Sequence, residues 1–260
     1  MINKILKVVK IGGNVISDNE KLDTFLSDFA AIEEPKILVH GGGKIATELA
    51  AKLGVKAKMI DGRRITDAQN LDIITMVYGG LVNKNIVARL QNSNCNALGL
   101  SGADANIVKA HKRIVSHIDY GFAGDIDEVD HYILETFLNS GITLVICPIT
   151  HDKKGQLLNT NADTMASEIA IALSKTFETH LYYCFEKKGV LRNVQEENSV
   201  IEYIDKEIYR QLRNEGIVAD GMLPKLENCF HALENNVEKV FLGDEKMIIQ
   251  NNPFATQVSL

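Results

Sequence analysis

Residues 156–172 read QLLNTNADTMASEIAIA, a polar turn that runs directly into a predicted helix. Asn159, Asn161 and Asp163 alternate in the turn, and apolar residues with helical spacing follow at Met165, Ile169, Ala172 and Leu173. Asn and Asp are good N-cap residues, because their side chains accept from the free N–H groups of a first turn. A cap needs only one such residue, however, and these polar groups gather after a strand-like run, TLVICP at 143–148. Ligands of open α/β sheets bind at the carboxyl ends of strands, so this turn is a candidate binding site.

Length and composition describe a folded globular chain. At 260 residues the chain can form one large α/β domain or two small ones, with an ample core. Hydrophobic residues make up 45% and charged residues 24% of the sequence, which is typical of globular proteins. The formal net charge of −6 leaves no basic footprint, and this argues against nucleic acid as the main partner.

The cysteines and the apolar pattern indicate a cytoplasmic location. The four cysteines lie far apart without a C-x-x-C motif, which favours reduced, mostly buried thiols over a zinc site or a disulfide framework. The first residues, MINKILKVVKIGG, are too charged for a signal peptide. No apolar run approaches the length of a membrane span. We therefore expect a cytoplasmic protein with no membrane partner.

The first predicted strand, 5–11 (ILKVVKI), ends at Gly12 and Gly13, and Lys10 lies one residue before its end. Glycine N–H groups and a lysine charge suit a phosphate. A strand followed by glycine is also common in α/β proteins without such a site. An amphipathic helix is predicted over 18–32.

The second predicted strand, 36–40 (KILVH), runs into Gly41, Gly42 and Gly43, and a helix is predicted over 45–53. Consecutive glycines allow the backbone to approach a ligand closely, and a helix N-terminus favours anions. A nicotinamide-dinucleotide fold is the nearest alternative. We rank it lower, because the spacing is not G-x-G-x-x-G and the loop is not the first in the chain.

A hairpin and a long helix follow. The hairpin is predicted over 56–66, with Gly62 at its turn and Arg63 and Arg64 directly after it. Adjacent arginines are usually a solvated pair, but beside anion-binding turns one of them could clamp a substrate carboxylate. The helix predicted over 68–91 is apolar on more than one face, which suits core packing on one side and a subunit interface on the other.

The middle of the chain is predicted to be mixed, with a strand over 97–100, a β-rich section over 107–126 and a helix over 128–139. The basic run KAHKR at 109–113 is interpreted as an exposed hairpin rather than a nucleic-acid patch. His151 follows in a predicted loop and has no evident partner. We interpret it as a surface residue rather than a general base.

A second α/β block begins after Ser174. Val190 and Leu191 are predicted to continue its first strand beyond a turn, and Lys225 lies at a helix N-terminus. A cation there opposes the helix dipole at a cost of up to about 1 kcal/mol. An anionic ligand shared by the lysine and the helix would explain that placement. The predicted elements of this block are strands over 180–185 and 238–242 and helices over 205–215 and 225–234.

Five motifs follow one another along the chain: VVKIGG (8–13), VHGGG (39–43), DGRRIT (61–66), LLNTNAD (157–163) and ADGMLPK (219–225). Together they resemble the amino-acid kinase family, and within it the kinases of N-acetyl-L-glutamate. The N-x-N-A-D turn with the downstream G-M-x-x-K is the specific part of this resemblance. The glycine turns are shared with carbamate, aspartate, uridylate and glutamate kinases.

The resemblance implies a three-layer αβα sandwich around a largely parallel sheet, as a single domain over 1–260. Residues 1–174 would form the acylglutamate-binding lobe and residues 175–260 the nucleotide-binding lobe. The implied reaction is ATP-dependent phosphorylation of the γ-carboxylate of an N-acyl-L-glutamate, the second step of arginine biosynthesis. N-acetyl-L-glutamate is the favoured acceptor. N-succinyl-L-glutamate as acceptor, and a ligand-binding protein without catalysis, stay open as alternatives.

The resemblance also implies roles for individual residues. Lys10 and Lys225 match the lysines that hold the phosphates, and Asp163 matches the aspartate that positions both. The implied acceptor contacts are Gly42, Gly43, Arg64, Asn159 and Asn161. The implied nucleotide or phosphate contacts are Lys10, Gly12, Gly13, Glu186, Gly189, Gly221, Met222 and Lys225. Mg²⁺ would enter with ATP, held by phosphate oxygens and water rather than by protein ligands.

The chain also departs from the family pattern. Phe185 and Glu186 stand where relatives usually carry Ser/Thr-Asp-Val, so the adenosine pocket is expected to differ. Ala255 and Thr256 stand where relatives often have Gly-Thr. The chain starts at its first strand, without the N-terminal helix of hexameric, arginine-inhibited relatives. We therefore expect a homodimer without that feedback inhibition.

Overall fold

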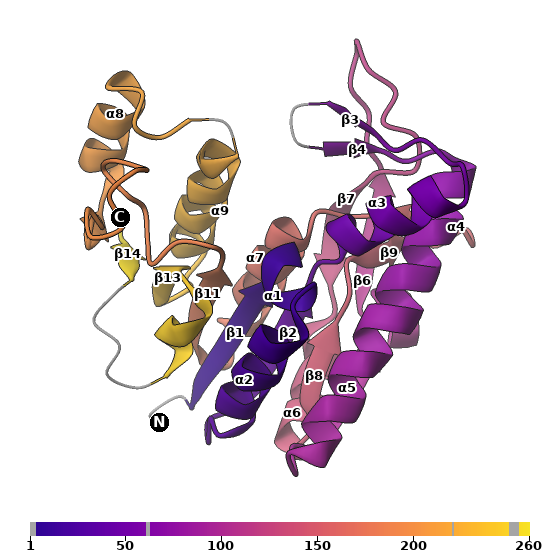
Figure 1. Cartoon of the computed structure of the whole chain (residues 1–260). Helices are drawn as coiled ribbons and strands as arrows, with labels where there is room; N and C mark the ends of the chain where they lie inside the picture. The colour runs from indigo at the N-terminus through magenta and orange to yellow at the C-terminus, as the bar shows by residue number, and fades with distance from the viewer. Residues whose placement is uncertain (1–3, 61–62, 220, 250–254) are drawn as a thin grey trace.

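A computed structural model describes residues 4–60, 63–219, 221–249 and 255–260, and Figure 1 shows their arrangement. An eight-stranded sheet crosses the molecule in the order β12-β14-β13-β11-β1-β2-β8-β5. The pairs from β5 to β13 are parallel, whereas β14 runs antiparallel to β13. The strands are β1 (Ile5–Ile11), β2 (Lys36–His40), β5 (Ala97–Leu100), β8 (Thr143–Ile146), β11 (Glu178–Cys184), β12 (Tyr203–Ile204), β13 (Lys239–Gly243) and β14 (Thr256–Val258).

Helices cover both faces of this sheet and complete a three-layer αβα sandwich, as predicted (Figure 1). Successive side chains of a strand point to opposite faces. Leu6 and Val8 of β1 therefore pack into one core, and Val9 and Ile11 pack into the other. The first core is closed by α6 (His131–Asn139), α7 (Ala162–Leu173), α8 (Lys206–Asn214) and α9 (Met222–Glu234). The second is closed by α1 (Gly13–Ile16), α2 (Asn19–Ala30), α3 (Gly43–Lys52), α4 (Ala68–Thr75), the η1 segment (Met76–Val82), α5 (Asn83–Asn92) and η3 (Glu245–Ile248).

A smaller sheet and a hairpin lie above the ends of β2 and β8 in Figure 1. The small sheet has the order β10-β9-β6-β7. The two strands of the hairpin pair in antiparallel fashion. The predicted turn residues Asp61 and Gly62, and Asp220 before α9, lie outside the described residues. The bounds are β3 (Lys58–Ile60), β4 (Arg63–Ile65), β6 (Val108–Lys112), β7 (Gly124–Val129), β9 (Ile149–His151) and β10 (Leu157–Asn159).

Most predicted elements are present, with differences at their ends. The strands predicted over 5–11, 36–40 and 97–100 have these bounds in the structure. The helix predicted over 128–139 begins only at His131, because β7 extends to Val129. Asp130 is the N-cap of the helix, and its side chain accepts a hydrogen bond from the Ile133 N–H at 3.2 Å. The helices predicted to start at residues 45 and 225 start earlier, at Gly43 and Met222.

Three further predictions about strands are wrong. Val190 and Leu191 do not continue β11, since Leu191 makes only an isolated bridge with Val200. The sequence predicts no strand after 238–242, whereas the chain returns through β14 (Thr256–Val258), which lies between β12 and β13 in the sheet. His151 belongs to β9, where it pairs with Leu157, rather than to a surface loop, and its buried Nε2 lacks a hydrogen-bond partner among the described residues.

The helix predicted over 68–91 consists of three segments. Between α4 and α5 lies a seven-residue π-helical stretch, Met76–Val82. A π-helical turn is wider than an α-helical one and shifts the face on which later side chains lie. Here both Val77 and Tyr78 are buried, and Asn83, the first residue of α5, is 1% exposed.

All four cysteines are free and buried, as predicted. Across the ranges that the structure describes, no helix is long and apolar enough to cross a membrane.

Candidate active site

Two lysines meet one aspartate at the carboxyl end of the central strands. Lys10 comes from β1, Asp163 from the first turn of α7, and Lys225 from the first turn of α9. Lys10 Nζ lies 2.7 Å from Asp163 Oδ1, and Lys225 Nζ donates to Asp163 Oδ2 at 2.6 Å. The three side chains are only 13%, 18% and 11% exposed, in the same order. The cluster therefore carries a net charge of +1 in a largely desolvated position.

The electrostatics of this cluster favour an ionised carboxylate. Burial alone would raise the pKa of Asp163, but the charges of Lys10 and Lys225 outweigh burial and hold that pKa well below its usual range. For Lys10, burial lowers the pKa, Asp163 opposes that change, and the like charge of Lys225 adds to it. Asp163 is thus the group that makes it possible to keep two lysines side by side.

Local structure explains why Asp163 takes this position. Asn161 is the N-cap of α7, and its side chain accepts from the backbone N–H groups of Asp163 and Thr164 at 2.8 and 3.1 Å. A carboxylate in a first helical turn is also favoured by the helix dipole. The alternating polar residues of the turn thus divide their work, because Asn161 caps the helix and Asp163 holds the lysines.

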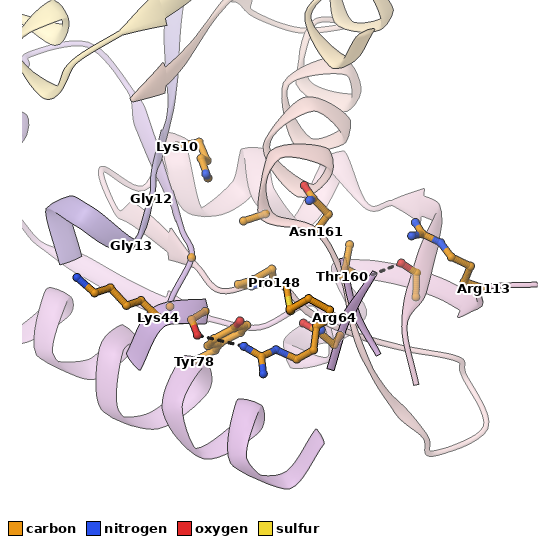
Figure 2. A pocket seen from close by; sticks show the side chains of 17 residues that line it. Lys10, Gly12, Gly13, Lys44, Arg64, Tyr78, Arg113, Pro148, Thr160 and Asn161 are labelled. Atoms are coloured by element: carbon orange, nitrogen blue, oxygen red, sulfur yellow. Dashed lines mark hydrogen bonds between the residues drawn. The ribbon is translucent and has the colours of Figure 1, made fainter. Parts of the chain in front are cut away.

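A cavity of about 300 Å³ opens beside Lys10 (Figure 2). Its wall includes both glycine turns, the polar turn of residues 159–161 and the β3–β4 hairpin. Of the predicted residues, it brings together Lys10, Gly12, Gly13, Gly42, Gly43, Arg64, Asn159 and Asn161. The predicted residues that do not line it are Asp163, Glu186, Gly189, Gly221, Met222 and Lys225.

Arg64 is 8% exposed and is fixed by its Nη2, which donates to the Gly43 carbonyl at 3.1 Å and to Thr47 Oγ1 at 2.6 Å. Asn159 Nδ2 donates to Thr66 Oγ1 at 3.0 Å. The guanidinium has five N–H donors and the amide has an oxygen acceptor, so both groups keep capacity for a ligand. The structure thus places one cation and one amide, both held in fixed positions, in the cavity wall.

Close approach requires a glycine at position 42 of the wall, because a Cβ there would lie 2.8 and 2.9 Å from ring carbons of Tyr78. At Gly12 an added Cβ would lie 3.7 Å from Lys10 Nζ, which is an ordinary van der Waals contact. Gly189 has a different reason. A Cβ there would lie 2.7 Å from Thr256 Oγ1, which itself accepts from Val190 N, so packing accounts for this glycine.

The other predicted nucleotide contacts lie in the C-terminal part. Glu186 is exposed and lines a separate cavity together with Phe185 and Lys187. Gly221 is the N-cap of α9 and Met222 is its first residue. The structure does not bring these residues together with the cavity of Figure 2, although Lys225 of the same helix turns toward Asp163.

Tyr78, Arg113 and Lys44 also line the cavity, although nothing in the sequence singles them out. Tyr78 reads as one apolar position among many in a long helix. Arg113 belongs to the basic run predicted as exposed, but it is 15% exposed and its Nε donates to Asp125 at 2.9 and 3.1 Å. For Arg113, the acidic residues of β7 opposite the basic run could have signalled a paired rather than an exposed side chain.

Residues 6–244 match the Amino acid kinase family, and the chain belongs to that family. Among curated proteins it is 52% identical to the acetylglutamate kinase of Cytophaga hutchinsonii, over 94% of this chain and 93% of that one. It is 51% identical to the acetylglutamate kinase of Parabacteroides distasonis, over 94% of this chain and 96% of that one. A solved structure of the smu.665 protein from Streptococcus mutans superimposes with a TM-score of 0.81 at 25% identity, over 98% of both chains.

Proposed function

We propose that this protein phosphorylates the γ-carboxylate of N-acetyl-L-glutamate with ATP and forms the acyl phosphate and ADP. This is the second step of arginine biosynthesis. The proposal rests on the Lys10–Asp163–Lys225 cluster at the edge of a cavity, in a chain about half identical to acetylglutamate kinases over nearly its whole length. We further propose that the enzyme acts in the cytoplasm.

The residues of the cluster match the demands of phosphoryl transfer. The nucleophile is a carboxylate that is already ionised at pH 7, so the reaction needs no general base. What it needs is alignment and stabilisation of negative charge on the transferred group. Lys10 and Lys225 supply that charge, and Asp163 holds both ammonium groups within hydrogen-bond distance of one carboxylate. Backbone N–H groups of the glycine turns at Gly12–Gly13 and Gly42–Gly43 would donate to phosphoryl oxygens.

We assign the acceptor to the cavity of Figure 2. The free N–H donors of Arg64 would bind the α-carboxylate, and the Asn159 carbonyl oxygen would accept from the acylamide N–H. Asn161 would contribute its amide N–H₂, since its oxygen is occupied by the helix cap. The names of the relatives favour an acetyl rather than a succinyl group on the nitrogen.

We assign the nucleotide to the part of the chain after residue 174. This boundary lies in the connection between α7 and β11. Glu186, Gly189, Gly221 and Met222 stay predictions for that site. Mg²⁺ is expected to enter with ATP. Phosphate oxygens and water would be its main ligands, because Mg²⁺ keeps several waters and binds readily to substrate phosphates.

A hydroxamate assay tests this proposal. Purified protein is incubated with ATP, Mg²⁺ and hydroxylamine, and with N-acetyl-glutamate, N-succinyl-glutamate, glutamate or aspartate in parallel. Signal with N-acetyl-glutamate is expected, together with a loss of roughly 100-fold or more in Lys10→Met and Lys225→Met. Signal only with N-succinyl-glutamate would change the acceptor. Silence with all four, and with GTP in place of ATP, would support a ligand-binding protein instead.

A further inference from the structure

Two aromatic rings lie against the ammonium group of Lys225. Its Nζ is 5.1 Å from the ring centroid of Tyr183 and 6.0 Å from that of Phe185. Both distances fall within the range in which a ring face attracts a cation. The same Nζ donates to Asp163 Oδ2 at 2.6 Å, so one carboxylate and two aromatic rings lie beside the group.

Tyr183 is built firmly into this position. It is completely buried in β11 and lies opposite Lys10 of β1 in the parallel register. Its hydroxyl donates to the backbone carbonyl of Asp163 at 3.0 Å. Burial holds the pKa of Tyr183 well above its usual range, so the hydroxyl stays a donor. One side chain thus contacts the first turn of α7 with its hydroxyl and the Lys225 ammonium with its ring.

Phe185 is also held by its backbone. It is the first residue after β11, and its N–H donates to the Gly243 carbonyl at the end of β13 at 2.8 Å. Its ring is half-buried and packs against the core under α7 and α9. The backbone hydrogen bond to β13 and the packing against the core therefore fix the ring beside Lys225.

We propose that Tyr183 and Phe185 are positioning residues that form an aromatic cradle for Lys225 and direct its ammonium group toward the transferred phosphoryl group. The proposal rests on the phosphotransfer function above and deepens it. It also assigns a use to Phe185, whose presence at the end of this strand the nucleotide site alone does not explain.

The physical reason lies in the count of hydrogen-bond donors. A lysine ammonium group has three N–H donors, and Asp163 accepts one of them. A ring face attracts the positive charge through its quadrupole without acting as a strong acceptor. The cradle therefore restricts Lys225 while leaving two donors for phosphoryl oxygens, whereas a hydroxyl or carboxylate in the same place would compete for them.

Stepwise fluorination of Phe185 tests the cradle. Mono-, tri- and pentafluorophenylalanine at this position keep the shape of the ring and progressively weaken its negative face. We expect kcat for acyl phosphate formation to fall with each step, by roughly 3- to 30-fold over the series, while the KM for N-acetyl-glutamate stays within about twofold. The kcat of Phe185→Leu should fall by a similar factor, whereas Phe185→Tyr should keep most of the wild-type kcat. A flat series would overturn the proposal, because packing alone does not respond to ring electrostatics.

The matched control is the same series at Phe177. This buried residue precedes β11 at the other end of the strand, roughly 26 Å from Phe185. No change in kcat is expected there. A fall as steep as that at Phe185 would mean that fluorination acts through the core, and the cradle would then be rejected.

A measurement without substrate separates the cradle from the proposed reaction. In protein labelled with ¹³C-lysine, ring currents should move the ε-methylene protons of Lys225 upfield, with Lys225→Arg identifying the signal. Phe185→Leu should reduce that shift and Phe185→Tyr should keep it. An unshifted signal overturns the cradle even where the wild type is active. A shifted signal in a protein that forms no acyl phosphate supports the cradle and rejects only the reaction.

Discussion

At the scale of single residues, the buried His40 fixes the backbone of the second glycine turn by a hydrogen bond. His40 is completely buried at the end of β2, directly before Gly41. Its Nδ1 lies 2.7 Å from the Gly41 carbonyl, which can only accept, so Nδ1 carries the proton. Nε2 then accepts from Asn83 Nδ2 at 3.1 Å, and Asn83 also donates to the Val145 carbonyl at 3.0 Å. A neutral imidazole forms both hydrogen bonds, to the Gly41 carbonyl and from the Asn83 amide. In an imidazolium the protonated Nε2 would instead face the N–H donor of Asn83.

This arrangement makes stability depend on pH. Burial lowers the pKa of His40 from 6.5 to about 4. Above pH 6.5 the residue is neutral in both states and contributes no pH dependence. Between pH 6.5 and 4 the unfolded chain binds a proton that the folded chain does not, so the free energy of unfolding falls as the pH is lowered, by about 3 kcal/mol in total.

Urea denaturation of wild type and His40→Gln at pH 7 and pH 4.5 measures this contribution. The wild type should lose more stability than the variant over that interval. His117→Gln serves as control, because His117 is exposed, and it should lose as much as the wild type. Parallel losses in wild type and His40→Gln would contradict the assignment of a neutral His40.

At the scale of elements, the π-helical segment supports the second glycine turn. Tyr78 of this segment is buried, its ring carbons lie close against Gly42, and it also lines the cavity (Figure 2). Asn83, the first residue after this segment, donates a hydrogen bond to His40, which directly precedes the same glycine turn. This irregular helix therefore fixes the position of the second glycine turn. The backbone N–H groups of that turn are the proposed hydrogen-bond donors to the phosphoryl group.

Gly42→Ala should disrupt this support. The new Cβ would lie 2.8 Å from the Tyr78 ring, so either the turn or the ring must move. A displacement of about 1 Å at a reacting group can cost 100-fold, and we expect kcat/KM to fall at least roughly tenfold. The double variant Gly42→Ala/Tyr78→Leu should recover part of this loss, as measured in the hydroxamate assay. Gly79→Ala, where the added Cβ meets open space, should stay near wild type. An unaffected Gly42→Ala enzyme would show that the ring is not a support.

At the scale of the whole molecule, the continuous sheet joins the two parts of the site. β1 and β11 pair along seven residues, from Ile5 with Glu178 to Ile11 with Cys184. Lys10 therefore stands next to Tyr183, across the boundary predicted at residue 174. The proposed acceptor and nucleotide lobes share one rigid element, and the lysine cluster lies where they meet.

The outer face of the segmented helix predicts the quaternary state. Met76 and Leu81 are 54% and 52% exposed there, and large exposed apolar side chains on one face indicate an interface. Light scattering should give about twice the chain mass of 28.7 kDa. Met76→Asp/Leu81→Asp should give monomers, while Tyr132→Asp, at a 72% exposed position on α6, should leave the dimer intact. A monomeric wild type would rule out the homodimer.

The sequence by itself determined the local structures and the candidate groups. Strands, glycine turns and the capped helix at Asn161 follow from periodicity and from hydrogen bonds between near neighbours, so a single stretch contains the information for each. For the same reason Lys10, Asp163 and Lys225 could be named as candidates before any fold was known. Some errors lie at element ends, where a cap such as Asp130 decides between strand and helix. Others concern whole elements, such as β14 and the π-helical segment, which depend on packing between distant residues.

Only the tertiary structure decided which candidates meet and what surrounds them. Lys10 and Lys225 are far apart in the chain, and the strand β1 together with α7 and α9, which cover one face of the sheet, brings them to one carboxylate. In the sequence Tyr183 looks like an ordinary strand residue and Phe185 only like a departure from the family pattern, and the tertiary structure places both rings beside Lys225. Such contacts depend on register and layer packing between distant segments, which no local pattern encodes.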